Sequence, residues 1–309
     1  MSILVVGTVA YDKIETPFGK TDKILGGAAT YISLTASKFT DNVNIVSIVG
    51  GDFDKKYIQL LTDRGINVRG LQIQPDEKTF FWSGKYDVDM NSRDTLVTEL
   101  NVLADFDPIL PETHKNPDYL VLGNLTPSVQ MRVIEQCTQK PKLTILDTMN
   151  FWMDHALSDL LKVLKKVDVL LINDGEARQL SGEYSLVKAA KKILTMGPKY
   201  LVIKKGEHGA LLFNENTVFF APALPLEDVF DPTGAGDTFA GGFIGYIAHR
   251  NNTSFETLKN AIIYGSAMAS FTVEKFGTDA LLNLSKEDIQ NRVQLFVDLV
   301  QFNINLVEK

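Results

Sequence analysis

Short apolar runs alternate with segments of helical spacing along most of this chain, and this alternation limits its possible folds more than any other feature. The first run, ILVVG at 3–7, ends in glycine and has the length of a buried strand, and a helix-like segment at 27–39 follows it. The same order recurs with the runs VNIVSIVG, YLVLGN, KLTILDTMN, VDVLLIN and KYLVIKKG. It predicts a doubly wound, mostly parallel α/β sheet, in one domain over residues 1–309.

Two regions, at about 11–25 and 70–104, interrupt this alternation. They carry aromatic or β-branched residues at alternating positions and contain turns, but no helical segment separates their strands. We interpret them as a small antiparallel β sheet that emerges from one edge of the domain and forms a lid. The alternative is an ordinary β extension of the core.

Composition and charge exclude several classes of protein. Apolar residues make up 45% of the chain and charged residues 22%, as in folded globular proteins, and the formal net charge is −7. A nucleic-acid or membrane surface is not expected, because such partners require a basic footprint and no run of about eighteen apolar residues occurs. Cys137 is the single cysteine, which favours the reducing cytoplasm.

The stretch DPTGAGDTFAGGF, at 231–243, places glycines before and inside a predicted helix from about Asp237 to His249. A helix start presents free backbone N–H groups, and Gly234 and Gly236 let an anion approach them closely. Asp237, in the first turn, is placed to accept a proton from a hydroxyl. The stretch therefore predicts phosphorylation of a hydroxyl group. The alternative, a packing helix with a glycine-rich entry loop, accounts only for the later glycines, 241–245.

Two other phosphate-binding motifs do not match. FGKTD ends like a P-loop, but Ile14 stands where that motif needs its first glycine. GAGDTF has Phe239 where a dinucleotide-binding fingerprint needs its third glycine.

Three motifs in order closely resemble the ribokinase-like (PfkB) family of carbohydrate and nucleoside kinases. DPTGAGDTFAGGF is similar to the C-terminal signature of that family, with Pro232 in place of the usual threonine. LGGAATYISLTAS resembles its N-terminal Gly-Gly substrate motif, and LLINDGEARQLSG contains its Asn-x-x-Glu. The order and spacing match over nearly the whole chain.

The resemblance implies that ATP and Mg²⁺ bind around the C-terminal signature. Asp237 would be the catalytic base, and the anion hole would be formed by Gly234, Ala235 and Gly236. Around the nucleotide, the implied residues are Asn173 and Glu176 for Mg²⁺ and its waters, Lys205 and Gly206 for the phosphates, and Asp231 and Thr233 for a possible K⁺. The alternative for Asn173 is a plain helix N-cap, and for Asp231 and Thr233 a cap of the loop.

On the substrate side, the resemblance implies that Asp12 binds sugar hydroxyls and that Gly26 and Gly27 admit the sugar to the backbone. A carboxylate can accept two hydroxyl hydrogen bonds, which suits a vicinal diol. Many relatives have lysine or asparagine after Gly-Gly and asparagine two residues later, but this chain has Ala28 and Thr30. Contacts at Thr30 are therefore altered. Asn91 and Arg93 on the lid are further candidate substrate contacts. For Trp152, a place in the core and a place in the pocket wall are both left as alternatives.

The expected function is transfer of the γ-phosphate of ATP to a primary hydroxyl of a sugar. The alternatives are a nucleoside kinase, suggested by the aromatic lid and the altered Gly-Gly motif, and a catalytically silent sugar- or nucleotide-binding regulator. We expect a homodimer with Phe80, Phe81 or Trp82 near the contact, because unpaired lid strands and aromatic faces are usually covered. In the competing arrangement, a monomer turns these aromatic residues toward its own substrate.

Overall fold

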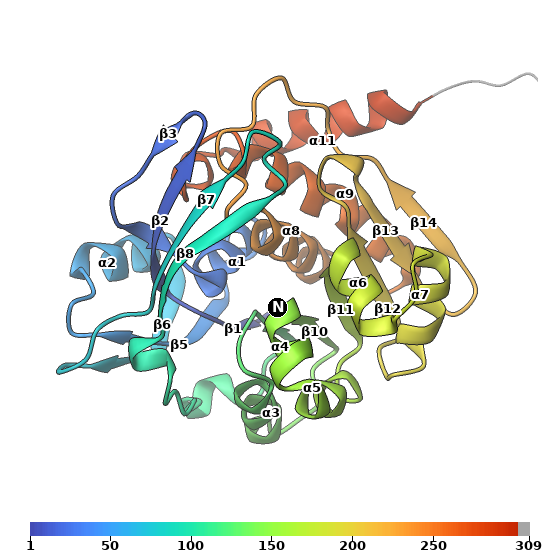
Figure 1. Cartoon of the computed structure of the whole chain (residues 1–309). Helices are drawn as coiled ribbons and strands as arrows, with labels where there is room; N and C mark the ends of the chain where they lie inside the picture. Colours follow the sequence, from blue (N-terminus) through green and yellow to red (C-terminus); the bar gives the residue numbers. More distant parts are fainter. Residues whose placement is uncertain (302–309) are drawn as a thin grey trace, which may run out of the picture.

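A nine-stranded sheet forms the centre of the computed structural model, which describes residues 1–301 (Figure 1). The last eight residues of the predicted domain, 302–309, lie outside this description. In spatial order the strands are β14 (Val218–Ala221), β13 (Ala210–Phe213), β12 (Tyr200–Lys204), β11 (Val169–Asn173), β10 (Leu143–Asp147), β9 (Tyr119–Leu122), β1 (Ile3–Val6), β5 (Val43–Gly50) and β6 (Ile66–Gln74).

The seven strands from β6 to β12 are parallel, and only β13 and β14 at one edge are antiparallel. The chain proceeds outward from β1 in both directions, through β5 and β6 on one side and β9 to β12 on the other. Ligands of such sheets bind beyond the carboxyl ends of the strands, near the point where the strand order reverses. Asp147, Asn173 and Lys204 are the last residues of the neighbouring strands β10, β11 and β12, so all three lie at these carboxyl ends. The predicted doubly wound, mostly parallel fold is confirmed.

Helices cover both faces of the large sheet, because its strands are apolar on both sides. One face packs against α1 (Ala28–Ala36), α2 (Lys55–Asp63), α8 (Ala235–Arg250), α9 (Phe255–Thr272), α10 (Asp279–Leu282) and α11 (Lys286–Val300). The other packs against α3 (Pro127–Gln136), α4 (Asn150–His155), α5 (Leu157–Leu164), α6 (Asp174–Ser181) and α7 (Leu186–Leu194). Two separate apolar cores result.

A second, five-stranded sheet, which we call the lid, stands beside the first (Figure 1). It consists of β3 (Gly19–Lys20), β2 (Ala10–Thr16), β7 (Phe81–Tyr86) and β8 (Arg93–Glu99), with β4 (Ile24–Gly26) paired to β2. Most pairs are antiparallel, but the central pair, β2 with β7, is parallel. The lid is therefore mixed, because its two hairpins come from distant parts of the chain and join side by side.

One segment that we assigned to the lid belongs elsewhere. Residues 70–74 are the end of β6, which pairs in parallel with β5 at the edge of the large sheet. Burial falls along this segment, from Gly70, which is buried, to Ile73 and Gln74, which are exposed at the end of the edge strand. The lid part of that region begins at β7, and residues 101–103 form a short 3₁₀ turn after β8.

Within residues 1–301, no helix combines the length and apolar character needed to cross a membrane.

Candidate active site

The glycine loop leads into α8, which begins at Ala235, two residues earlier than predicted. Gly234 is its N-cap, with a positive φ of 75°, and no side chain caps the helix. A Cβ at Gly234 would lie 2.5 Å from the ring of Tyr31, so only glycine fits there. The N–H of Ala235 donates to the Pro232 carbonyl, whereas those of Gly236 and Asp237 lie in the first turn, where the helix offers no acceptor. The Ala235 amide of the predicted anion hole is therefore already paired, and the free amides of this turn include Gly236 from the predicted set and Asp237 from outside it.

Asp237 lies partly buried in the first turn of α8, beside the free amides. Burial raises the pKa of its carboxyl to about 7, and the nearby charge of Asp147 adds to this rise. Asp12 acts in the same direction, while Lys204 and Arg93 lower the pKa. A carboxyl with this pKa is matched to proton transfer near neutral pH, which fits the predicted catalytic base.

Lys204 and Asp147 lie next to this loop, and neither was predicted from the sequence. The Lys204 Nζ is 3.4 Å from the Asp147 Oδ2, and a Cβ at Gly236 would lie 3.0 Å from the same Nζ. Burial disfavours the charged ammonium, but the carboxylates of Asp147, Glu176 and Asp237 together raise the pKa of Lys204. The alternation of β12 could have indicated this, because Lys204 shares a face with Val202, which packs on the α8 side.

Asn173 and Glu176 form a capping box at the start of α6. The Glu176 N–H donates to Asn173 Oδ1 (2.8 Å), and the Asn173 N–H donates to Glu176 Oε2 (2.7 Å). The alternative role of Asn173 as a helix N-cap is therefore present. The Glu176 carboxyl is buried, which raises its pKa to about 7, with a further contribution from Asp147. Its Oε1 accepts no hydrogen bond from residues 1–301, and it remains open to water bound to a metal ion.

The loop after β12 carries the other predicted nucleotide contacts. Lys205 is partly exposed and forms no ion pair with residues 1–301. Gly206 has a positive φ of 54°, and a Cβ there would lie 3.2 Å from the Asn91 Oδ1. The tip of the β7–β8 hairpin thus reaches the loop on the far side of the site. Asn91 therefore lies against a loop predicted to bind the nucleotide, although it was itself predicted to contact the substrate.

Asp12 and the Gly-Gly motif lie together at the base of the lid. A Cβ at Gly26 would come within 1.9 Å of Asp12 Oδ2, so glycine makes room for the carboxylate. Gly27 has a φ of 92°, and a Cβ there would lie 2.4 Å from the Thr8 carbonyl oxygen. Burial raises the pKa of Asp12 to about 7, against a hydrogen bond from the Gly27 amide that lowers it. The structure brings these three predicted residues together.

Thr30 does not face this group. Its side chain is fully buried, and its hydroxyl donates to the Gly26 carbonyl at 2.7 Å. It supports the first turn of α1 and the preceding glycine from behind, in place of the predicted substrate contact.

Arg93 and Trp82 are on the face of the lid that carries Asp12. Asp12 pairs in register with Trp82 across β2 and β7, so the two side chains share a face. The Arg93 guanidinium lies over the Trp82 ring, 5.4 Å from its centroid. Burial raises the pKa of Tyr86, and the charge of Arg93 opposes this rise. Phe81 faces the other way, in register with Tyr11. Arg93 and Trp82 thus complete the lid side of the site.

Asp231 and Thr233 stabilise the loop before α8. Asp231 is fully buried and accepts hydrogen bonds from the N–H groups of Thr233 (2.9 Å) and Gly277 (2.8 Å). The Thr233 hydroxyl donates to the Tyr86 hydroxyl at 3.1 Å, which joins the loop to the lid. Burial raises the pKa of Asp231, and no basic side chain among residues 1–301 forms an ion pair with it. The capping alternative is thus present, and the uncompensated carboxylate also suits a cation.

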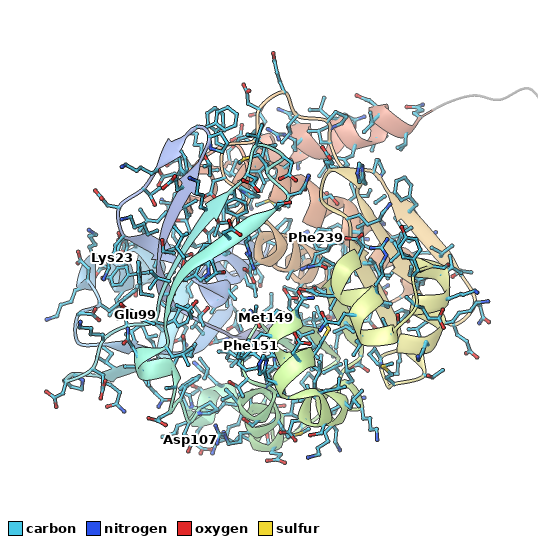
Figure 2. All side chains as sticks on the ribbon, in the orientation of Figure 1. Lys23, Glu99, Asp107, Met149, Phe151 and Phe239 are labelled. Carbon is cyan, nitrogen blue, oxygen red and sulfur yellow. The ribbon has the colours of Figure 1, made fainter. Side chains whose placement is uncertain are left out.

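Trp152 belongs to a small polar and aromatic group at the ends of β9 and β10. Its Nε1 donates to Asn124 Oδ1 (2.8 Å), and the Asn124 amide donates to the Met149 sulfur. Phe151 is exposed and packs edge-on against Trp152. Figure 2 places Met149 and Phe151 between the lid and α6. Trp152 is partly exposed, so its position favours the pocket-wall alternative.

Comparison with known proteins agrees with this geometry. A cytidine kinase of Thermococcus kodakarensis is 29% identical over 90% of this chain and 98% of its own. A nucleoside kinase of Methanothermobacter thermautotrophicus is 27% identical over 89% of this chain and 90% of its own. A ribokinase-family nucleoside kinase from Methanocaldococcus jannaschii has a similar fold, with a TM-score of 0.76 at 21% identity over 95% and 98% of the two chains.

An E. coli structure described as a putative ribokinase II with ATP and Mg²⁺ also shares the fold, with a TM-score of 0.78 at 19% identity over 95% and 99% of the two chains. The family model for pfkB carbohydrate kinases matches residues 2–284. The chain therefore belongs to the pfkB family of carbohydrate kinases, whose members are ATP-dependent kinases.

Proposed function

We propose that this kinase phosphorylates a primary hydroxyl of a nucleoside. The observation that carries this proposal is the indole of Trp82 on the same lid face as the Asp12 carboxylate. Asp12 suits the diol of a ribose, and a flat aromatic ring on the same face suits a base attached to that ribose. The similarity to a cytidine kinase and a nucleoside kinase supports the same substrate class. A free sugar, which would use Asp12 without Trp82, is the second candidate.

In the proposed reaction, Asp237 accepts the proton of the acceptor hydroxyl. The hydroxyl oxygen forms a bond to the γ-phosphorus of ATP, the bond from that phosphorus to the bridging oxygen breaks, and ADP leaves. The free N–H groups of Gly236 and Asp237 stabilise the charge that develops on the phosphoryl oxygens. Intact residues in each of these roles argue against a silent regulator.

The residues around the phosphate site fit ATP with Mg²⁺. Bound Mg²⁺ would neutralise phosphate charge, and Glu176 would hold one of its waters through Oε1. Glu176 is the single carboxylate proposed here, since residues 1–301 contain no cluster of three or more His, Cys, Asp or Glu side chains placed to bind a metal ion. Lys205 and Gly206 would follow the phosphates along the loop after β12.

A monovalent cation at Asp231 is part of the proposal. The buried carboxylate has no ion-pair partner in the described chain, so a K⁺ ion beside it and Thr233 would balance its charge and fix the loop. Potassium should then raise kcat above that in a bulky organic cation. Equal rates in the two salts would remove this part of the proposal.

The acceptor class can be tested by ADP release. The purified protein is mixed with ATP, Mg²⁺ and single nucleosides or sugars, and a coupled assay measures ADP. We expect a nucleoside to give the highest kcat/KM, and Trp82→Ala to raise its KM while the KM for ATP stays within about threefold. A sugar with a higher kcat/KM than every nucleoside would establish the second candidate, a sugar kinase. Release with none of them would favour the regulator.

We also propose a homodimer that forms through the outer face of the lid. β8 is the edge strand, and its side chains Leu96 and Val97 are 55% and 40% exposed. A cavity of about 270 Å³ on the lid is lined in part by these two residues and by Phe81 and Ser83. Phe81 itself is only partly exposed, so Leu96→Glu is a sharper test than a change at Phe81. Light scattering that finds a wild-type monomer at high micromolar concentration would contradict the dimer.

The unpaired Cys137 supports a location in the reducing cytoplasm, which we include in the proposal.

A further inference from the structure

Two lysines at opposite ends of strand β12, one just before it and one its last residue, form ion pairs. Lys199, just before the strand, lies 3.3 Å from Asp168 Oδ1, and its side chain is 68% exposed. Lys204, the last residue of the strand, lies 3.4 Å from Asp147 Oδ2, and its side chain is only 17% exposed. In the first pair only the aspartate is buried and the lysine stays in water, whereas the second pair removes both charges from water at the edge where the site lies.

A buried ion pair adds little net stability, because the cost of desolvation offsets much of the attraction between its charges. A role in the site explains such a pair better than stability does. Asp147 is fixed from its other side, since Oδ1 accepts the Thr148 N–H at 2.9 Å. Within residues 1–301 the Lys204 ammonium donates only to Asp147, so two of its three N–H groups are free there. Its Nζ lies directly against Gly236. These free donors therefore lie beside the free amides of α8.

We propose that Lys204 is a further catalytic residue, whose ammonium contacts the phosphoryl group during its transfer, and that Asp147 is a positioning residue that holds this ammonium against Gly236. Neither the motifs nor the family resemblance assigns a role to these two side chains. The proposal concerns the kinase reaction itself and does not depend on whether the acceptor is a nucleoside or a sugar.

The chemistry of the transfer gives such an ammonium a definite use. Charge accumulates on the equatorial oxygens of the phosphoryl group while the bond to ADP breaks, and two amides supply only partial positive charge. Lys204 adds a full charge with free donors, and its own side chain is only 17% exposed, which strengthens its electrostatic effect. The ammonium stays protonated throughout, because three carboxylates raise its pKa.

The first test compares Lys204→Met with the matched control Lys199→Met. We expect Lys204→Met to lower kcat by about 10²–10³-fold, the usual loss on removing one such donor, while the acceptor KM stays within about threefold. The control should keep wild-type kcat. Calorimetry with Mg²⁺ should show that Lys204→Met weakens the binding of ATP more than the binding of ADP. This measurement does not depend on the acceptor. Equal loss for both nucleotides, or a kcat within about threefold of wild type, would overturn the proposal.

The second test uses the pH dependence of kcat/KM. The charged or titratable groups that affect the base Asp237 are Asp147, Lys204, Asp12, Arg93 and Tyr31. Removing the positive charge in Lys204→Met should move the acid limb to higher pH, and removing the negative charge in Asp147→Asn should move it to lower pH. Lys204→Arg, which keeps the charge, should restore the limb. A shift of the limb in the same direction for both variants would contradict the proposed arrangement, and thermal unfolding checks that each variant folds.

Discussion

Replacing Asp237 with asparagine should remove activity and make the unliganded protein more stable. The side chain keeps its size, so the start of α8 should be unchanged. Without a carboxylate to accept the hydroxyl proton, kcat should fall by at least about a hundredfold. The gain in stability follows from the environment of the carboxylate, because burial and the charge of Asp147 raise its pKa from 3.8 to about 7.

The size of that gain can be worked from the shift. About three pKa units correspond to about 4 kcal/mol against the ionised form in the folded state. Because the side chain of Asp237 is partly exposed, solvent screens its charge, and we expect roughly half of this, about 2 kcal/mol. The folded pKa is the higher one, so the penalty is absent below pH 4. It grows as pH rises from about 4 to about 7 and is constant above pH 7.

Urea unfolding of the wild type and Asp237→Asn at pH 4 and pH 8 checks this directly. The variant should be more stable at pH 8 and equal to the wild type at pH 4, while Asp228→Asn, a matched change on an exposed loop, should show no such dependence. Wild-type stability for Asp237→Asn at both pH values would refute the electrostatic reasoning. Near-wild-type turnover would refute the catalytic assignment.

Three further outcomes follow from the site. The acid limb of kcat/KM should have an apparent pKa near 7, since the base Asp237 must be ionised to act, and a limb near pH 4 would contradict this. Gly26→Ala should raise the acceptor KM by more than tenfold with little change in the KM for ATP, because the new Cβ displaces the Asp12 carboxylate. An acceptor KM equal to that of the wild type would contradict this. Thr30→Ala should cost about 1 kcal/mol of stability in thermal unfolding, for its lost hydrogen bond, yet leave the acceptor KM within about threefold.

Local sequence rules predicted the parts of the site that lie within one continuous stretch. The glycines before α8 predicted a helix start with free amides, and Asp237 lies in its first turn. The spacing of Asn173 and Glu176 also has a purely local cause, since each caps the backbone of the other. These features depend on neighbours within a few residues, so a sequence without its fold is sufficient to find them.

The parts that depend on register could not be found in the same way. Lys205 was predicted from the resemblance of its stretch to the family's phosphate loop. A one-residue step along β12 exchanges the two faces of the strand, and the neighbouring Lys204 reaches the site. Asp147 lies on β10, two strands away from β12, and becomes its partner only through sheet order. The parallel pair of β2 with β7 joins residues about seventy positions apart, which no local pattern specifies.

The β7–β8 hairpin contacts two separate loops of the site, the loop before α8 and the loop after β12. Its Tyr86 accepts the hydrogen bond from Thr233, and the Asn91 at its tip lies against Gly206. Because one hairpin makes both contacts, we expect the loop before α8 and the loop after β12 to be released together when the hairpin moves. Maximal turnover should then follow the opening of the hairpin and slow in viscous solvent. A closed hairpin should also keep bulk water from the phosphoryl group and so limit hydrolysis of ATP when no acceptor is present.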